Sequence, residues 1–314
     1  MALVGADGSQ VQYSGTLTGG GFQGTASAAG RTVDVVGVAA APAVQRLINI
    51  SSRARVGSGD NIIIAGFVVT GSKPKDLLVR AVGPGLTQFG VTGPLANPVV
   101  RVLRGSETVL ENDDWDASGT IGAVSAETGA RVGAFPLSSG SKDAAMFTAL
   151  TPGLYTAQIS GNGGEGVSLV EIYDATSFSP DAPRVVNIST RAQVGTGADI
   201  LIAGFVVDGT SAKKVLVRAA GPALGGFGLT TALADPQLKL YRDGILVAEN
   251  DNWSTESADL ISAAAAKVGA FAFAPASKDA AMLIYLPPGV YSAQVSGVEG
   301  VTGVALVEIY EVIE

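Results

Sequence analysis

Two short polar runs, at residues 111–116 and 249–254, place several oxygen ligands close together in the chain. Ca²⁺ takes roughly six to eight oxygen ligands from carboxylates and carbonyls. An Asx-turn, in which Asn and Asp hydrogen-bond their own backbone, is the alternative interpretation. In the second run Asn252 replaces Asp114 and Ser254 replaces Asp116, so calcium should bind there more weakly or not at all. The candidate calcium ligands are Asn112, Asp113, Asp114, Asp116, Asn250 and Asp251.

Trp115 and Trp253 are the only tryptophans, and they stand at equivalent positions beside these polar runs. An aromatic face next to polar turn residues could stack against a sugar ring, so both are candidate ligand-binding residues. The alternative is that each indole closes one end of a hydrophobic core.

The residue types exclude most catalytic chemistry. The chain has no Cys and no His, so it can form no disulfide, Cys/His zinc site or Ser-His-Asp triad. Ser139 and Lys142 match a Ser-x-x-Lys motif, but Pro275 replaces the serine in the second copy, which indicates a chance match. A Ser-Lys-Asp motif at residues 141–143 recurs at 277–279. Its Asp143 and Asp279 should pair with Arg80 and Arg218 or join the acidic turn. We expect no enzyme.

Composition narrows the classes of partner. The chain has 20 basic and 28 acidic residues, a formal charge of −8 and a pI of about 4.7. With no basic patch, it should bind neither nucleic acid nor an anionic lipid surface. A hydrophobic fraction of 47% is too high for a disordered chain, yet no apolar run is long enough for a membrane span. The first residues show no signal peptide, as expected for a cytosolic chain or for an excised part of a secreted protein.

The elements that must position these residues occur twice. Arg46–Ser51 recurs as Arg184–Ser189, and most of the following sequence repeats with it. This predicts a module at residues 44–176, a proline-containing linker at 177–183 and a second module at 184–314.

Short aliphatic runs between Gly, Pro, Asn and Asp clusters predict an all-β protein with two tandem Greek-key or jelly-roll-like β-sandwich domains. Leu150–Tyr155 and its copy Leu286–Tyr291 read Leu-x-Pro-Gly-x-Tyr, which is typical of a tyrosine corner. The Ala-rich segment Glu256–Val268 predicts a short helix.

Residues 1–43 belong to neither copy and predict a β-rich extension of three strands. So few strands cannot bury a core alone. They could pack on the first module, or add to the open sheet edge of another copy and so build a filament. The candidate assembly residues are Tyr13, Leu17, Phe22, Val33, Val35 and Val38.

One segment of each module resembles a known family. Its order is a strand, Asn112–Trp115, a Pro-Gly-x-Tyr turn and a strand ending in Ser-Gly. This resembles the bacterial pre-peptidase C-terminal domain, and also an uncharacterised duplicated module of large secreted bacterial proteins. The likeness covers residues 99–173 and 237–310. It implies an exported, non-catalytic sandwich, of a type that in some cases binds calcium and in others collagen or further polymers.

Together these features predict an extracellular or cell-surface structural protein, a subunit of a bacterial fibre or matrix. Copies would assemble head-to-tail through β-strand contacts of the extension. The alternative is a calcium-dependent accessory module that adheres to glycan or matrix polysaccharide.

Overall fold

The computed structural model describes residues 2–4, 10–18, 21–28, 31–38, 46–116, 126–176, 184–255 and 257–312. The predicted linker at 177–183 lies outside these residues. Contacts divide the chain into two units, Met1–Val44 and Gln45–Glu314. The fold is all-β, as predicted.

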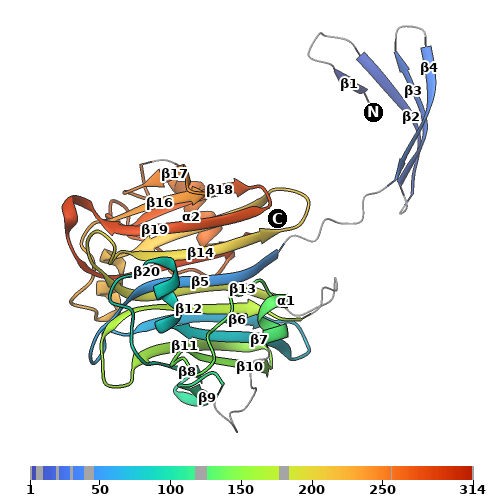
Figure 1. The fold of residues 1–314 in the computed structure, drawn as a ribbon. Helices are drawn as coiled ribbons and strands as arrows, with labels where there is room; N and C mark the ends of the chain where they lie inside the picture. Colours follow the sequence, from blue (N-terminus) through green and yellow to red (C-terminus); the bar gives the residue numbers. More distant parts are fainter. Residues whose placement is uncertain are drawn as a thin grey trace. The chain divides into compact units, whose positions relative to one another are not determined.

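The first unit is an antiparallel sheet in the order β1-β2-β3-β4 (Figure 1). Three of its strands lie where the sequence predicts them. The strands are β1 (Ala2–Val4), β2 (Gln10–Thr18), β3 (Gly21–Ala28) and β4 (Arg31–Val38).

In the second unit, each repeat contributes eight strands in the same order. The first repeat supplies β5 (Arg46–Val56), β6 (Ile63–Thr70), β7 (Lys75–Val82), β8 (Pro98–Arg104), β9 (Glu107–Asn112), β10 (Ala144–Leu150), β11 (Gly153–Gly161) and β12 (Gly166–Asp174). The second supplies β13 (Arg184–Val194), β14 (Leu201–Asp208), β15 (Lys213–Ala220), β16 (Pro236–Arg242), β17 (Ile245–Asn250), β18 (Ala280–Leu286), β19 (Gly289–Gly297) and β20 (Gly303–Glu311).

Helices are few and short. The helix predicted near residues 256–268 is confirmed as α2, and none of the described helices is long and apolar enough to cross a membrane. The α-helices are α1 (Ala126–Arg131) and α2 (Ala258–Lys267), and the 3-10 helices are η1 (Pro84–Phe89), η2 (Pro222–Phe227) and η3 (Val298–Gly300).

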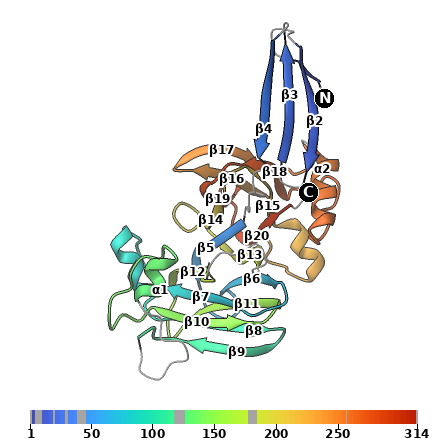
Figure 2. The same cartoon turned by 90° about the vertical axis from the view of Figure 1, so that its right-hand side faces the viewer.

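The strands of the two repeats are interleaved. β5 pairs with β12 of its own repeat and with β14 of the other, while β13 pairs with β20 and with β6. The pairings form two continuous antiparallel paths, β10-β7-β12-β5-β14-β19-β16-β17 and β18-β15-β20-β13-β6-β11-β8-β9. Arg55 pairs with Gln193 where the paths meet, which joins them as one 16-stranded sheet. Figure 2 shows the repeats at opposite ends of this unit, with β5 and β13 between them.

The junction is built from equivalent positions of the two repeats. Ser52 Oγ and Thr190 Oγ1 are hydrogen-bonded at 2.7 Å in the buried interior. A Cβ on Gly66 would lie 2.7 Å from Ser189 Oγ, so a larger residue at position 66 would force the serine side chain or the two strands to shift. Gly204 stands in the same relation to Ser51. Each repeat therefore completes the other, and separate tandem sandwiches are not confirmed.

One main core runs through the second unit. It contains buried side chains from both repeats, including Phe67 and Phe205. The tyrosine corner is confirmed, because the Tyr155 hydroxyl donates to Thr151 O at 2.9 Å and the Tyr291 hydroxyl to Pro287 O at 2.7 Å. These corners fix the starts of β11 and β19 against the turns before them.

Candidate functional site

The asparagine of each polar run connects two strands. Asn112 Oδ1 accepts the Ala145 N–H at 2.9 Å, and its amide donates to Asp114 O at 3.1 Å. Asn250 Oδ1 likewise accepts the Ala281 N–H at 3.0 Å. Both asparagines thus tie the end of one strand to the start of another, which is a structural role that reaches beyond the local hydrogen bonds of an Asx-turn.

The acidic side chains of the first run also have protein partners. Asp114 forms an ion pair with Lys142 at 2.8 Å. Asp116 accepts the Gly140 N–H at 2.7 Å, and this bond is the main reason its pKa lies below the ordinary value. Asp113 and Asp251 are exposed. Among the described residues, no group of three or more acidic side chains is placed to hold a metal, and calcium stays a prediction.

The aspartate of the repeated Ser-Lys-Asp motif fixes a 3-10 turn. Asp143 is fully buried and accepts the N–H groups of Gly83 at 2.8 Å and Gly85 at 3.1 Å. Asp279 does the same for Gly221 at 2.8 Å and Ala223 at 3.2 Å. The predicted arginine pairing is wrong, because backbone N–H donors take these carboxylate oxygens.

The arginines instead pair with glutamates of the neighbouring strand. Arg80 Nε lies 3.0 Å from Glu171 Oε2, and Arg218 Nε lies 3.2 Å from Glu308 Oε2. Tyr310 donates to the other oxygen of Glu308 at 2.6 Å. Burial raises the pKa of Glu171 and Glu308, and the adjacent arginine opposes this rise. The same burial lowers the pKa of Arg218.

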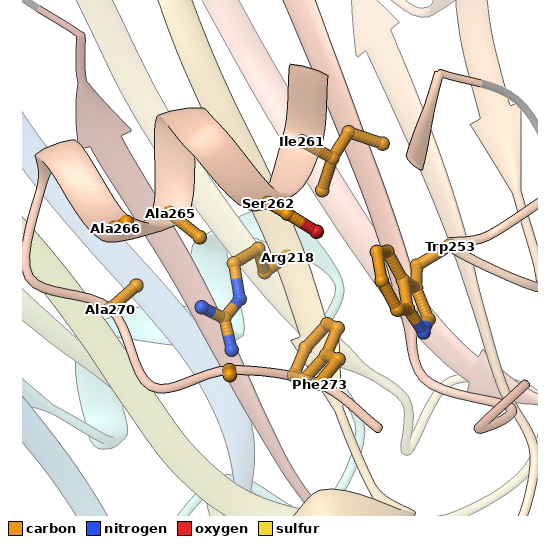
Figure 3. A pocket seen from close by; sticks show the side chains of 9 residues that line it. Arg218, Trp253, Ile261, Ser262, Ala265, Ala266, Ala270 and Phe273 are labelled. Atoms are coloured by element: carbon orange, nitrogen blue, oxygen red, sulfur yellow. The ribbon is translucent and has the colours of Figure 1, made fainter. Parts of the chain in front are cut away.

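A cavity of about 90 Å³ lies beside Arg218 in the second repeat (Figure 3). The Ala-rich helix α2 forms one wall because alanine leaves space that larger side chains would fill. The segment after α2 and the indole of Trp253 form the others. The lining residues include Arg218, Trp253, Ile261, Ala265, Ala270 and Phe273.

The two predicted tryptophans differ in exposure. Trp253 is 6% exposed, and its Nε1–H donates to Ala274 O at 3.2 Å. Trp115 is half-buried and donates to Ser138 O at 3.1 Å. The Trp253 ring is therefore a cavity wall and not an open stacking face. Sequence reasoning missed Arg218 as a site residue, although a repeated arginine inside an aliphatic strand was an available signal.

The N-terminal sheet brings most of the predicted assembly residues to one face. Tyr13 pairs with Ala26, which pairs with Val33, so these positions share a face. Leu17, Phe22 and Val35 lie on the same face, and Val38 lies on the opposite one.

One edge strand of the second unit is apolar. β17 pairs only with β16 among the described strands. Ile245, Leu246 and Val247 on it are 69%, 44% and 43% exposed. The equivalent strand β9 begins with Glu107 and Thr108. The second repeat therefore presents the more apolar sheet edge.

Comparison with known proteins gives no family. No protein-family profile matches the chain, and no curated protein matches it. A solved structure of PNGF-II aligns over all of this chain and 83% of its own, at 13% identity and a TM-score of 0.19. A DUF4785 family protein of Legionella pneumophila aligns over 86% of this chain and 84% of its own, at 9% identity and a TM-score of 0.19. Likenesses this weak carry no functional argument.

Proposed function

We propose that this chain is a non-catalytic structural subunit that assembles with further copies of itself through its N-terminal sheet. The observation that carries the proposal is the register of that sheet. It gathers Tyr13, Leu17, Phe22, Val33 and Val35 on one face.

The opposite face supports the same idea. Most of its positions are polar, including Ser14, Gln23, Thr25 and Asp34, and its apolar members include Val36 and Val38. A single sheet with one apolar and one polar face needs a second layer over the apolar face to be stable. Burying one large apolar side chain contributes about 1.5–3 kcal/mol, so five such positions can support a lasting contact.

We propose that the acceptor is the β17 edge of the next copy. The exposed Ile245, Leu246 and Val247 offer apolar surface to the donor face, while the unpaired backbone N–H and C=O groups of this edge can pair with an edge strand of the donor sheet. Donor and acceptor surfaces differ, so the contact is heterologous and can propagate into a fibre.

The proposed setting is extracellular or at the cell surface. Its support is the resemblance of both repeats to modules of secreted bacterial proteins. The absence of catalysis is proposed because the most buried acids hold the fold. Asp143 and Asp279 fix turns, and Glu171 and Glu308 hold arginines.

A charge-insertion pair in the intact chain tests the donor surface. Phe22→Asp places a carboxylate on the apolar face, whereas Gln23→Asp places one on the polar face of the same strand. Light scattering should show self-association of wild type and Gln23→Asp, weakened at least about 100-fold in Phe22→Asp, which corresponds to about 2.8 kcal/mol. Equal association of both variants would overturn the proposal.

The acceptor surface has its own matched pair. Leu246→Asp should weaken association, while Thr108→Asp at the equivalent position of β9 should leave it unchanged. If Leu246→Asp assembles like wild type, β17 is not the acceptor.

A further inference from the structure

Arg218, which lines the cavity, has a hydrogen-bond donor without an acceptor among the described residues. Arg218 is 1% exposed, and its Nη1 donates to Phe271 O at 2.8 Å. Its Nε faces Glu308 Oε2, but its Nη2 has no hydrogen-bond partner within the described part of the chain. A buried donor in this state is unfavourable, so an acceptor that enters the cavity gains a bond.

Aromatic rings hold the guanidinium in place. Its Cζ lies 3.9 Å from the ring centre of Phe273 and 4.5 Å from that of Phe271. Phe271 and Phe273 contact each other edge to face, and Trp253 contacts Phe273 in the same way. A guanidinium fixed in this manner loses little freedom when it binds, which favours affinity.

Charge decides what kind of acceptor fits. Glu308 already neutralises Arg218, and Asp279 also acts on the guanidinium electrostatically. A further negative charge would meet these carboxylates in a poorly solvated place. The remaining walls are mainly apolar, from Ile261, Ala265 and Phe273. A neutral ligand with an apolar body is therefore favoured over an anion.

We propose that this cavity binds a compact neutral molecule that has a small apolar ring and one carbonyl or hydroxyl oxygen. The oxygen accepts from Arg218 Nη2, and the ring lies among Trp253, Phe273 and the alanines of α2. The volume of about 90 Å³ is about three fifths of the roughly 150 Å³ of an engineered cavity that holds benzene, so a ring of five atoms with one oxygen fills the cavity and reaches its exposed rim at Ser262 and Ala266.

One ring of the aromatic wall, Phe273, is specific to the second repeat. Leu137 and Pro136 of the first repeat replace Phe273 and Ala272. Arg80 still donates to Phe135 O at 2.8 Å, so the arginine is common to both repeats but the second ring is not. Phe273→Leu should therefore weaken binding while keeping the Arg218–Glu308 pair.

Trp253 emission reports binding directly in an intact Trp115→Phe chain, where it is the only indole. The probe is cyclopentanone, and cyclopentanecarboxylate is its anionic counterpart. Two variants of α2 serve as a pair. Ala266→Leu fills the rim of the cavity, and Ala263→Leu places the same side chain on an exposed position outside it.

We expect a saturable emission change with cyclopentanone, kept in Ala263→Leu and lost in Ala266→Leu. Cyclopentanecarboxylate should bind at least about tenfold more weakly. Saturation that survives in Ala266→Leu would place the ketone elsewhere and overturn the proposal. Tighter binding of the carboxylate would overturn the neutral-ligand assignment. No saturable change with either probe would also overturn the proposal and would indicate a cavity that holds water only.

Discussion

The interleaving of the repeats predicts a specific energetic coupling between Gly66 and Ser189. Alanine at position 66 would place its Cβ 2.7 Å from Ser189 Oγ, which is closer than real Cβ atoms lie. Overpacking of this kind costs about 1–3 kcal/mol, against a gain of about 0.5–1 kcal/mol from removing a glycine from a strand. Gly66→Ala should thus lower the free energy of unfolding by about 1 kcal/mol.

Removing the obstructing oxygen should reverse the effect. In a Ser189→Ala background, Gly66→Ala should be neutral or stabilising, which gives a coupling energy of about 1–2 kcal/mol in urea unfolding. Ser51→Ala is the matched control, because Ser51 lies against Gly204 and not against Gly66. It should be additive with Gly66→Ala within about 0.5 kcal/mol. No coupling to Ser189, or equal coupling to both serines, would refute the pairing of β6 with β13 of the other repeat.

Three further predictions concern buried and charged groups. Asp279→Ala should lower the free energy of unfolding by at least about 2 kcal/mol, because the buried Gly221 N–H loses its acceptor; a smaller loss by urea titration would contradict this. Burial raises the pKa of Glu308 above its ordinary value of 4.5, so the folded protein holds this proton more tightly than the unfolded chain does. This difference stabilises the folded state fully below about pH 4.5, and the stabilisation is lost as the pH rises through the folded pKa. Glu308→Gln should therefore flatten the fall in unfolding free energy from pH 4.5 towards neutral, and an unchanged slope would argue against this linkage. Millimolar calcium should leave the melting temperature unchanged, because Asp114 already pairs with Lys142; a rise that Asp114→Asn abolishes would show a calcium site instead.

Local patterns in the sequence predicted much of the fold. The glycine-punctuated aliphatic runs, the Leu-x-Pro-Gly-x-Tyr corners and the Ala-rich helix each depend on neighbours close in the chain. The pairing of β5 with β14, and of β13 with β6, could not be predicted from such local patterns. The alternation of buried and half-buried residues along β6 shows that one face is covered. That alternation would be the same whether the neighbouring strand were β5 or, as observed, β13. The sequence predicted a duplication without saying which repeat completes which sheet.

For the candidate sites too, residue types and repetition predicted which residues matter, whereas their roles depend on contacts between distant segments. Asn112 and Asp116 were singled out for their oxygen atoms, yet those atoms accept backbone N–H groups from segments more than twenty residues away. Trp253 was found from its repetition, but its role as a cavity wall depends on Phe273 and on the packing of α2. The common face of Tyr13 and Phe22 follows from strand register, which turn lengths only suggest.

The mass of the intact protein across a concentration series tests the proposed assembly most directly. Light scattering should give a mean mass that rises with concentration above the 31.4 kDa of one chain, and electron microscopy of the same samples should show linear polymers. A mass of 31.4 kDa at every concentration, with single particles on the grid, would contradict self-assembly through the N-terminal sheet.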